Sequence, residues 1–253
     1  MPLSDRDRSS GSFYSGLLPA GVKWLLIINV SIFLLMFFTA GTTFGQLFRP
    51  LGLTPRWVVE RFAVWQPFTY MFLHYPGDLL SILFNMLTLW WIGAALEQTW
   101  GRRRFVRFYL LCGLGAGVCV VLLNYIFRRP DVWAVGANGA VYGILVAFAV
   151  LFPNVTMLFM MIFPMKAKYM VMLLGAISFL IAYGSAGGAV TAVAQLGGMA
   201  VGYAQLKVKT KHKISFDPLG VLRQQYKDWK FRRAKKKFQV YLKKKNGPDR
   251  WVQ

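Results

Sequence analysis

The chain is poor in charged residues, and in acidic ones above all. Only 15% of its 253 residues are charged, and 9 aspartates and glutamates stand against 30 lysines and arginines. A soluble domain usually carries about a quarter charged residues. The apolar residues make up 56% of the chain, they gather in blocks, and the mean hydropathy is +0.45. These proportions exclude an ordinary soluble domain and predict a polytopic membrane protein.

Cysteine and histidine are also scarce, with 2 of each. Cys112 and Cys119 lie in one apolar block, about 10 Å apart along a helix, which is beyond the reach of a disulfide. We interpret them as packing residues. Because His, Cys, Asp and Glu form no cluster with metal-ligand spacing, the sequence predicts neither a metal site nor another cofactor. The polar start of the chain and the first apolar block lack the features of a cleavable signal peptide.

Six apolar blocks approach the roughly 20 residues that a helix needs to cross the hydrocarbon core of a bilayer. The fourth and fifth are short, as is typical of helices inside a bundle, and an apolar patch at Val155–Pro164 is expected to extend the fourth block or the loop after it. The sequence predicts an all-α, six-helix membrane domain over 23–206, a polar segment over 1–22 and a basic tail over 207–253. The blocks are Trp24–Ala40, Leu79–Leu96, Phe105–Ile126, Gly136–Phe152, Tyr169–Tyr183 and Gly187–Leu206.

Lysines and arginines in the short loops predict the orientation in the membrane. One side receives the N-terminal arginines, the Arg102–Arg104 loop, Lys166, Lys168 and the tail. The other side receives fewer, namely Arg49, Arg56, Arg61, Arg128 and Arg129. Both termini are therefore predicted to be cytoplasmic, in the inner or plasma membrane of a bacterium.

The tail holds 16 of the 30 lysines and arginines. Its apolar residues recur every three or four positions, which predicts an amphipathic helix with a lysine-rich face. Such a helix suits an anionic membrane surface, with aromatic side chains at headgroup depth. We favour this partner over nucleic acid, which basic residues interleaved with aromatics also bind; a merely solvated helix is the third interpretation. The aromatic residues in question are Tyr226, Trp229, Phe231 and Phe238.

Polar residues stand at unexpected depth in three of the apolar blocks. Asn85 lies inside the second block, Asn138 stands in "GANG" at the mouth of the fourth, and Gln195 lies in "AQLGGMAVG" of the sixth. Polar groups inside a membrane are costly and usually face a protein interior or a water-filled cavity. These three residues are therefore the candidates for a functional site.

The stretches that carry them resemble the rhomboid family of intramembrane serine proteases over about residues 20–206. The similar motifs occur in the family's order, which is more specific than any one of them. They are "WQPFTYMFLH", "FNMLTLWWIGAALEQTWGRRRF", "GANGAVYG", "FPMKAKY" and "AQLGGMAVG". The resemblance implies the six-helix rhomboid fold and a site built from the second, fourth and sixth helices.

The resemblance also implies roles for particular positions. The family's nucleophilic serine falls on Asn138 and its general-base histidine on Gln195, while the oxyanion donors fall on Ser81 and Asn85. A carboxamide nitrogen is not nucleophilic, and a glutamine has no group that titrates near neutral pH. The "HYPGDLLS" stretch also holds two residues more than the family's usual spacing, which shifts His74 and blurs the alignment over Tyr75–Leu80. A Ser81–His74 pair has no motif to support it.

Glycines accompany both degenerate positions. Small residues spaced three or four apart let two membrane helices approach closely, so the fourth and sixth helices are expected to pack together. Asn138 and Gln195 are then expected to exchange amide hydrogen bonds, and Glu97 and Arg104 to be structural partners. The glycines are Gly136, Gly139 and Gly143 on one helix and Gly198 and Gly202 on the other.

These features favour a pseudoprotease, a catalytically degenerate rhomboid that binds transmembrane segments of client proteins without cleaving them. The family resemblance places client access between the second and fifth helices. The alternative is a working intramembrane serine endopeptidase, and a transporter or lipid scramblase is a third interpretation with little support.

Overall fold

Helices lie in all six of the predicted blocks. The structure, a computed structural model, describes residues 18–159, 163–184 and 189–209. The second block is built from three consecutive pieces, the helix α4, the π-helical turn η3 and the helix α5. The segments are α1 (Ala20–Phe38), α4 (Leu79–Thr88), η3 (Leu89–Gly93), α5 (Ala94–Trp100), α6 (Arg102–Ile126), α7 (Asn138–Leu151), α8 (Ala167–Gly184) and α9 (Ala189–Lys209).

Three helical segments of the described residues are long and apolar enough to cross a membrane. They are Ala20–Phe38, Leu79–Trp100 and Arg102–Ile126, and the shorter helices Asn138–Leu151 and Ala167–Tyr183 are apolar as well. The chain is therefore a helical membrane protein. A total of six crossings stays a prediction. The predicted helix of the basic tail lies outside the described residues.

A two-stranded antiparallel hairpin follows α7, where the sequence predicted only helix or loop. The strands β1 (Thr156–Phe159) and β2 (Phe163–Lys166) pair from Thr156 opposite Lys166 to Phe159 opposite Phe163. A short apolar run does not distinguish a strand from a helix by its periodicity. Since α7 ends at Leu151, Val155–Pro164 does not extend the fourth helix and instead belongs to the connection after it, the other alternative that the sequence left open.

Short elements fill the connection between α1 and α4. They are η1 (Phe44–Leu51), α2 (Pro55–Glu60), α3 (Gln66–Thr69) and η2 (Tyr70–Phe72). The buried Gln66 side chain accepts a hydrogen bond from the Thr54 backbone N–H at 2.9 Å and donates one to the Pro50 carbonyl at 3.1 Å. Gln66 of the motif "WQPFT" thus ties α3 to the segment around Pro50 and Thr54 within this connection.

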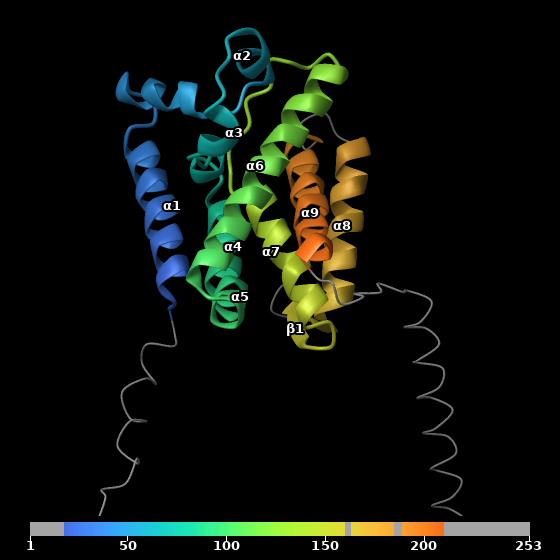
Figure 1. Cartoon of the computed structure of the whole chain (residues 1–253). Coiled ribbons are helices and arrows are strands. Elements are labelled where there is room, and N and C mark those ends of the chain that lie inside the picture. The colour runs from blue at the N-terminus through green and yellow to red at the C-terminus, as the bar shows by residue number, and fades with distance from the viewer. Residues whose placement is uncertain (1–17, 160–162, 185–188, 210–253) are drawn as a thin grey trace, which may run out of the picture. The chain divides into compact units, whose positions relative to one another are not determined.

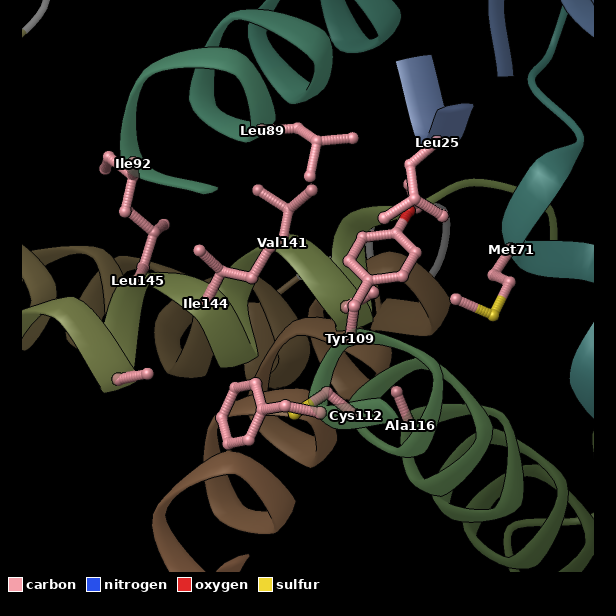
Figure 2. Close-up of a cluster of buried hydrophobic side chains, with 14 of the residues drawn as sticks. Leu25, Met71, Leu89, Ile92, Tyr109, Cys112, Ala116, Val141, Ile144 and Leu145 are labelled. Atoms are coloured by element: carbon pink, nitrogen blue, oxygen red, sulfur yellow. The ribbon is translucent and has the colours of Figure 1, made fainter. Parts of the chain in front are cut away.

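The helices α6, α7 and α9 form the centre of the bundle, with α8 against α9 and α1 against α6 and η3. In Figure 1 α1 and α8 lie at opposite edges, and the chain enters α1 at the end of the bundle where α5 also lies. Figure 2 shows part of the core, in which apolar side chains from η3, α6 and α7 meet. Among them are Leu89, Ile92, Tyr109, Cys112, Val141 and Ile144.

A buried carboxylate holds α1 against α5. Glu97 is 5% exposed, and its two oxygens accept hydrogen bonds from the backbone N–H groups of Gly21 at 2.8 Å and Val22 at 2.7 Å. The first N–H groups of a helix have no partner within it, and a negative charge there also meets the favourable end of the helix dipole. Pro19, which precedes α1, offers no side-chain cap. Glu97 therefore caps α1 from a distant part of the chain.

Arg104 has a different partner from the one predicted. Its guanidinium lies 5.0 Å from the centre of the Trp100 ring, a cation–π contact. Glu97 and Arg104 were expected to pair with each other. Instead Glu97 binds the first turn of α1, and Arg104 contacts the Trp100 ring.

Removing the Glu97 carboxylate is expected to destabilise the helical domain. Glu97→Ala leaves two buried N–H groups without acceptors, so we expect a loss of about 2–4 kcal/mol, because an unsatisfied buried donor costs about 1–3 kcal/mol. Glu97→Gln keeps one acceptor oxygen and is expected to cost less. Thermal unfolding of the purified chain in detergent measures both.

Glu60→Ala is the matched control, because Glu60 is an exposed glutamate that forms an ion pair with Arg56 on the same helix, at 3.7 Å. Such a surface pair is worth about 0–1 kcal/mol. Equal losses for Glu97→Ala and Glu60→Ala would contradict the capping role.

Candidate functional site

The helices α7 and α9 touch backbone to backbone. A Cβ atom placed on Gly198 would collide with the Gly139 carbonyl, and one placed on Gly202 would lie 3.0 Å from the Gly143 Cα. No side chain fits between the helices at these two levels. The structure thus brings together the two pairs of glycines that the sequence singled out. This contact sets the distance between α7 and α9, the helices that carry Asn138 and Gln195.

Gly136 has another role than the one predicted for it. It precedes α7, which begins at Asn138, so it is not part of the helix stripe. Its φ is +123°, a conformation that side chains other than glycine's disfavour, and its N–H donates to the Tyr70 carbonyl at 3.0 Å. Tyr70 also donates its hydroxyl hydrogen to the Gly113 carbonyl on α6 at 2.9 Å. Gly136 and Tyr70 therefore fix where α7 starts.

Asn138 and Gln195 flank the same helix crossing. Asn138 is the first residue of α7 and Gln195 lies in the second turn of α9. Their chain neighbours are in contact, since a Cβ on Gly139 would lie 3.0 Å from the Ala194 carbonyl oxygen. Both side chains are half-buried. The mouth of α7 and the face of α9 therefore meet at these two positions.

The hydrogen bond of Gln195 goes to α8 and not to Asn138. The Ser178 hydroxyl lies 2.7 Å from Gln195 Oε1 and 2.8 Å from the Leu174 carbonyl oxygen, two acceptors that share its single hydrogen. Tyr142 on α7 is also within hydrogen-bonding reach of Ser178. No hydrogen bond joins Asn138 to Gln195 in this part of the structure. The polar cluster of Tyr142, Ser178 and Gln195 instead connects α7, α8 and α9.

Ser178 and Tyr142 were missed by sequence reasoning. Ser178 lies outside the family motifs, and Tyr142 lies within "GANGAVYG" but was interpreted as a packing residue. The spacing of Ser178 on its own helix says nothing of which neighbour it faces. The only available signal was its depth inside an apolar block, the same signal that had singled out Gln195.

Ser81 and Asn85 lie on α4, four residues apart. The Ser81 N–H donates to Asp78 Oδ1 at 3.0 Å, so Asp78 caps α4 and the Ser81 hydroxyl is not needed for the cap. The Asn85 side chain is buried, and its Nδ2 donor has no partner. The two extra residues of "HYPGDLLS" form a turn, closed by the Asp78 N–H donating to the Tyr75 carbonyl at 3.0 Å.

His74 is buried before α4, and neither of its ring nitrogens completes a hydrogen bond. Burial lowers the pKa of His74 to about 4, against the smaller opposing effects of the Phe72 backbone and the Asp78 carboxylate. The imidazole is therefore neutral at physiological pH. No serine or cysteine of the described residues donates a hydrogen bond to it, so the structure shows no activated nucleophile beside His74.

The arrangement defines a class of protein: a helical membrane protein with a polar site at the crossing of two glycine-packed helices. A family model described as "Rhomboid domain" matches residues 61–211, which is more than half of the chain. The chain belongs to the rhomboid family.

Named relatives agree with this assignment over shorter stretches. The chain is 39% identical over 88 residues to RHOMBOID-like protein 1 of Arabidopsis thaliana, a match that covers 35% of this chain and 21% of that protein. It is 32% identical over 87 residues to the rhomboid protease GlpG of Salmonella newport, covering 34% of this chain and 29% of that protein. The matches thus span less than a third of either relative's length. Since one of these is a plant protein, the comparisons do not support the predicted bacterial origin.

Widening the α7–α9 contact is expected to unfold the site. Gly198→Ala would place a methyl group on the Gly139 carbonyl, so the two helices must separate. We expect a loss of about 2 kcal/mol or more, within the range found for overpacked cores. The measurement is thermal unfolding in detergent.

Gly175→Ala on α8 is the matched control for this substitution. Its added methyl would meet only the flexible Met199 side chain, at 3.4 Å from Cε, which is an ordinary contact. Alanine is also the better helix former by about 1 kcal/mol. We expect Gly175→Ala to be neutral or stabilising, and equal destabilisation by both changes would refute the contact.

Proposed function

We propose that this rhomboid is a pseudoprotease that binds transmembrane segments of client proteins without cleaving them. One observation carries the proposal: at the α7–α9 crossing, the family's nucleophile and base positions hold two carboxamides, Asn138 and Gln195. Neither supplies a nucleophile or a proton acceptor near neutral pH. Loss of a nucleophile or its base typically lowers turnover by about 10⁶-fold.

The polar contacts at this crossing support a binding role. The bond between Ser178 and Gln195 occupies the amide oxygen, while the half-buried Asn138 side chain keeps hydrogen-bonding capacity. A transmembrane segment that exposes a backbone carbonyl or a polar side chain can use such donors, which lipid cannot satisfy. The plain alternative is that the amides only stabilise helix packing, by about 0.6–2 kcal/mol.

Client access is proposed to run between the second helix and α8, as the family resemblance implies. Both carry large exposed apolar side chains that a transmembrane partner can cover. On the second helix these are Leu80, Leu83, Phe84 and Trp91, and on α8 they are Phe179, Leu180 and Tyr183.

The second candidate is a working serine endopeptidase. What favours it is that one relative, GlpG, is named a rhomboid protease. The chemistry of Asn138 and Gln195 weighs against it. We also propose, from the sequence alone, that the basic tail binds anionic membrane surface and that both termini face the cytoplasm.

The binding role predicts a selective crosslink. A photoreactive amino acid at Asn138 in the full chain, expressed in native membranes, is expected to capture a membrane protein in a discrete band. The same residue at Leu122, an exposed lipid-facing position on α6, serves as the control and is expected to yield only lipid or diffuse products. Capture of the same proteins from both positions, or of none from Asn138, would count against client binding.

The degenerate site predicts which changes restore chemistry. Asn138→Ser alone and Gln195→His alone are expected to stay inactive, because each lacks the other half of the dyad. The double change is expected to give weak cleavage of a model transmembrane substrate, improved by Ser81→His, since one missing oxyanion donor costs about 10²–10³-fold. Ser81→His leaves the Asp78 cap intact because only the Ser81 backbone takes part in it.

A fluorophosphonate probe measures the same outcome without the natural client, because it labels only an activated serine. Labelling or cleavage by the unmodified chain above background would establish the protease and overturn the proposal. A silent triple variant that still folds would show that more than these three positions has diverged.

A further inference from the structure

A cavity of about 780 Å³ lies apart from the elements that form the α7–α9 crossing. Its walls come from the C-terminal end of α1, from η1 and α2, from the turn Tyr75–Gly77 and from Asp131 and Trp133. No residue of α7 or α9 lines it. Much of the wall precedes residue 61, where the rhomboid domain match begins. In Figure 1 the η1 ribbon extends sideways from the upper end of α1.

The charges of the cavity favour an anion. Arg49 lines it and has no ion pair within the described ranges, whereas the one lining carboxylate, Asp131, is already paired with Arg56 at 2.9 Å. The Gln46 side chain adds an amide that can donate hydrogen bonds. Arginine is suited to phosphate because its planar guanidinium presents several donors at once. The uncompensated charge is therefore that of Arg49, and its complement is a phosphate.

The remaining walls favour an amphiphile over a soluble anion. Met36 and Ala40, from the end of α1, line the side toward the apolar length of that helix, and Trp57, Tyr75 and Trp133 line the other sides. Tryptophan and tyrosine concentrate at the headgroup level of membranes, where one end of the side chain is apolar and the other polar. A molecule with a phosphate and a hydrocarbon chain matches both parts of this lining.

The side of η1 that points away from the cavity carries exposed apolar side chains. Gly45, Gln46, Phe48 and Arg49 face the cavity, while Phe44 and Leu47 are 71% and 68% exposed. Phe38, at the end of α1, is 77% exposed. Large apolar side chains so exposed are typical of elements that lie in the membrane interface. The cavity thus opens among surfaces that lipid covers.

We propose that this cavity binds a phospholipid, with the phosphodiester on Arg49 and the start of an acyl chain beside Met36 and Ala40. The volume falls in the range of ligand sites and suits a headgroup with its glycerol, with the chains continuing outside along α1. The site tethers the connection between α1 and α4 to the lipid leaflet. It does not depend on whether the α7–α9 site cleaves, binds or only packs.

Native mass spectrometry of the full chain in detergent, titrated with defined ligands, tests the proposal. Phosphatidylglycerol is expected to bind, while diacylglycerol, which lacks the phosphate, and glycerol 3-phosphate, which lacks the chains, are expected to bind far more weakly. Arg49→Gln is expected to weaken phosphatidylglycerol binding by about tenfold or more, since a hydrogen bond to a charged group is lost. The matched control, Arg129→Gln, removes an exposed arginine that does not line the cavity.

Ala40→Trp keeps every charge and places an indole ring where the acyl chain is proposed to begin, so it is expected to reduce phosphatidylglycerol binding even if Arg49→Gln fails to fold. Thermal unfolding confirms that each variant is native before it is titrated. Equal effects of Arg49→Gln and Arg129→Gln, or glycerol 3-phosphate binding as tightly as the lipid, would overturn the phospholipid site. An unaltered affinity in Ala40→Trp would overturn it as well.

Discussion

The absence of side chains between α7 and α9 is the constraint on which the rest of the helical domain depends. Gly198 lies against the Gly139 carbonyl, and Gly202 against Gly143, so the two backbones pack directly. Without a hydrophobic effect between helices in lipid, such close packing is a main source of association. Because α6 and α8 pack on the same pair, the separation of α7 and α9 also determines where those helices sit.

Polar side chains lie at the same crossing, namely Asn138 at the start of α7 and Gln195 on α9. A helix mouth held this close to a neighbour still needs partners for its polar groups, and an amide supplies donors and acceptors without a titrating proton. Ser178 and Tyr142 complete the set around Gln195. Gln195, Ser178 and Tyr142 thus join α7, α8 and α9 through neutral hydrogen-bonding groups.

The helix positions could be predicted because long apolar blocks have one solution in a membrane, and the glycine pairs could be predicted from their spacing. The predictions that were wrong concerned contacts between residues that are distant in the sequence. The helix α1 starts at Ala20 instead of Trp24 because Glu97 caps its first turn. The hydrogen-bond partner of Gln195 depends on which face of α8 turns inward. Gly136 lies before α7 and not in its glycine stripe, where its N–H binds the Tyr70 carbonyl. The β1–β2 hairpin was missed because a short apolar run fits either periodicity.

The hydrogen bonds of Glu97 impose an order in time on the assembly of the protein. The N–H group of Val22 and the carboxylate that satisfies it are 75 residues apart in the chain. During synthesis from the N-terminus, α1 is therefore complete long before its acceptor exists, and its first turn has to rely on water or headgroups at the membrane surface. Only when α5 emerges does the first turn of α1 move from solvent into protein. Because α5 is synthesised before α6, α7, α8 and α9, this contact between α1 and α5 can form before the rest of the bundle has emerged.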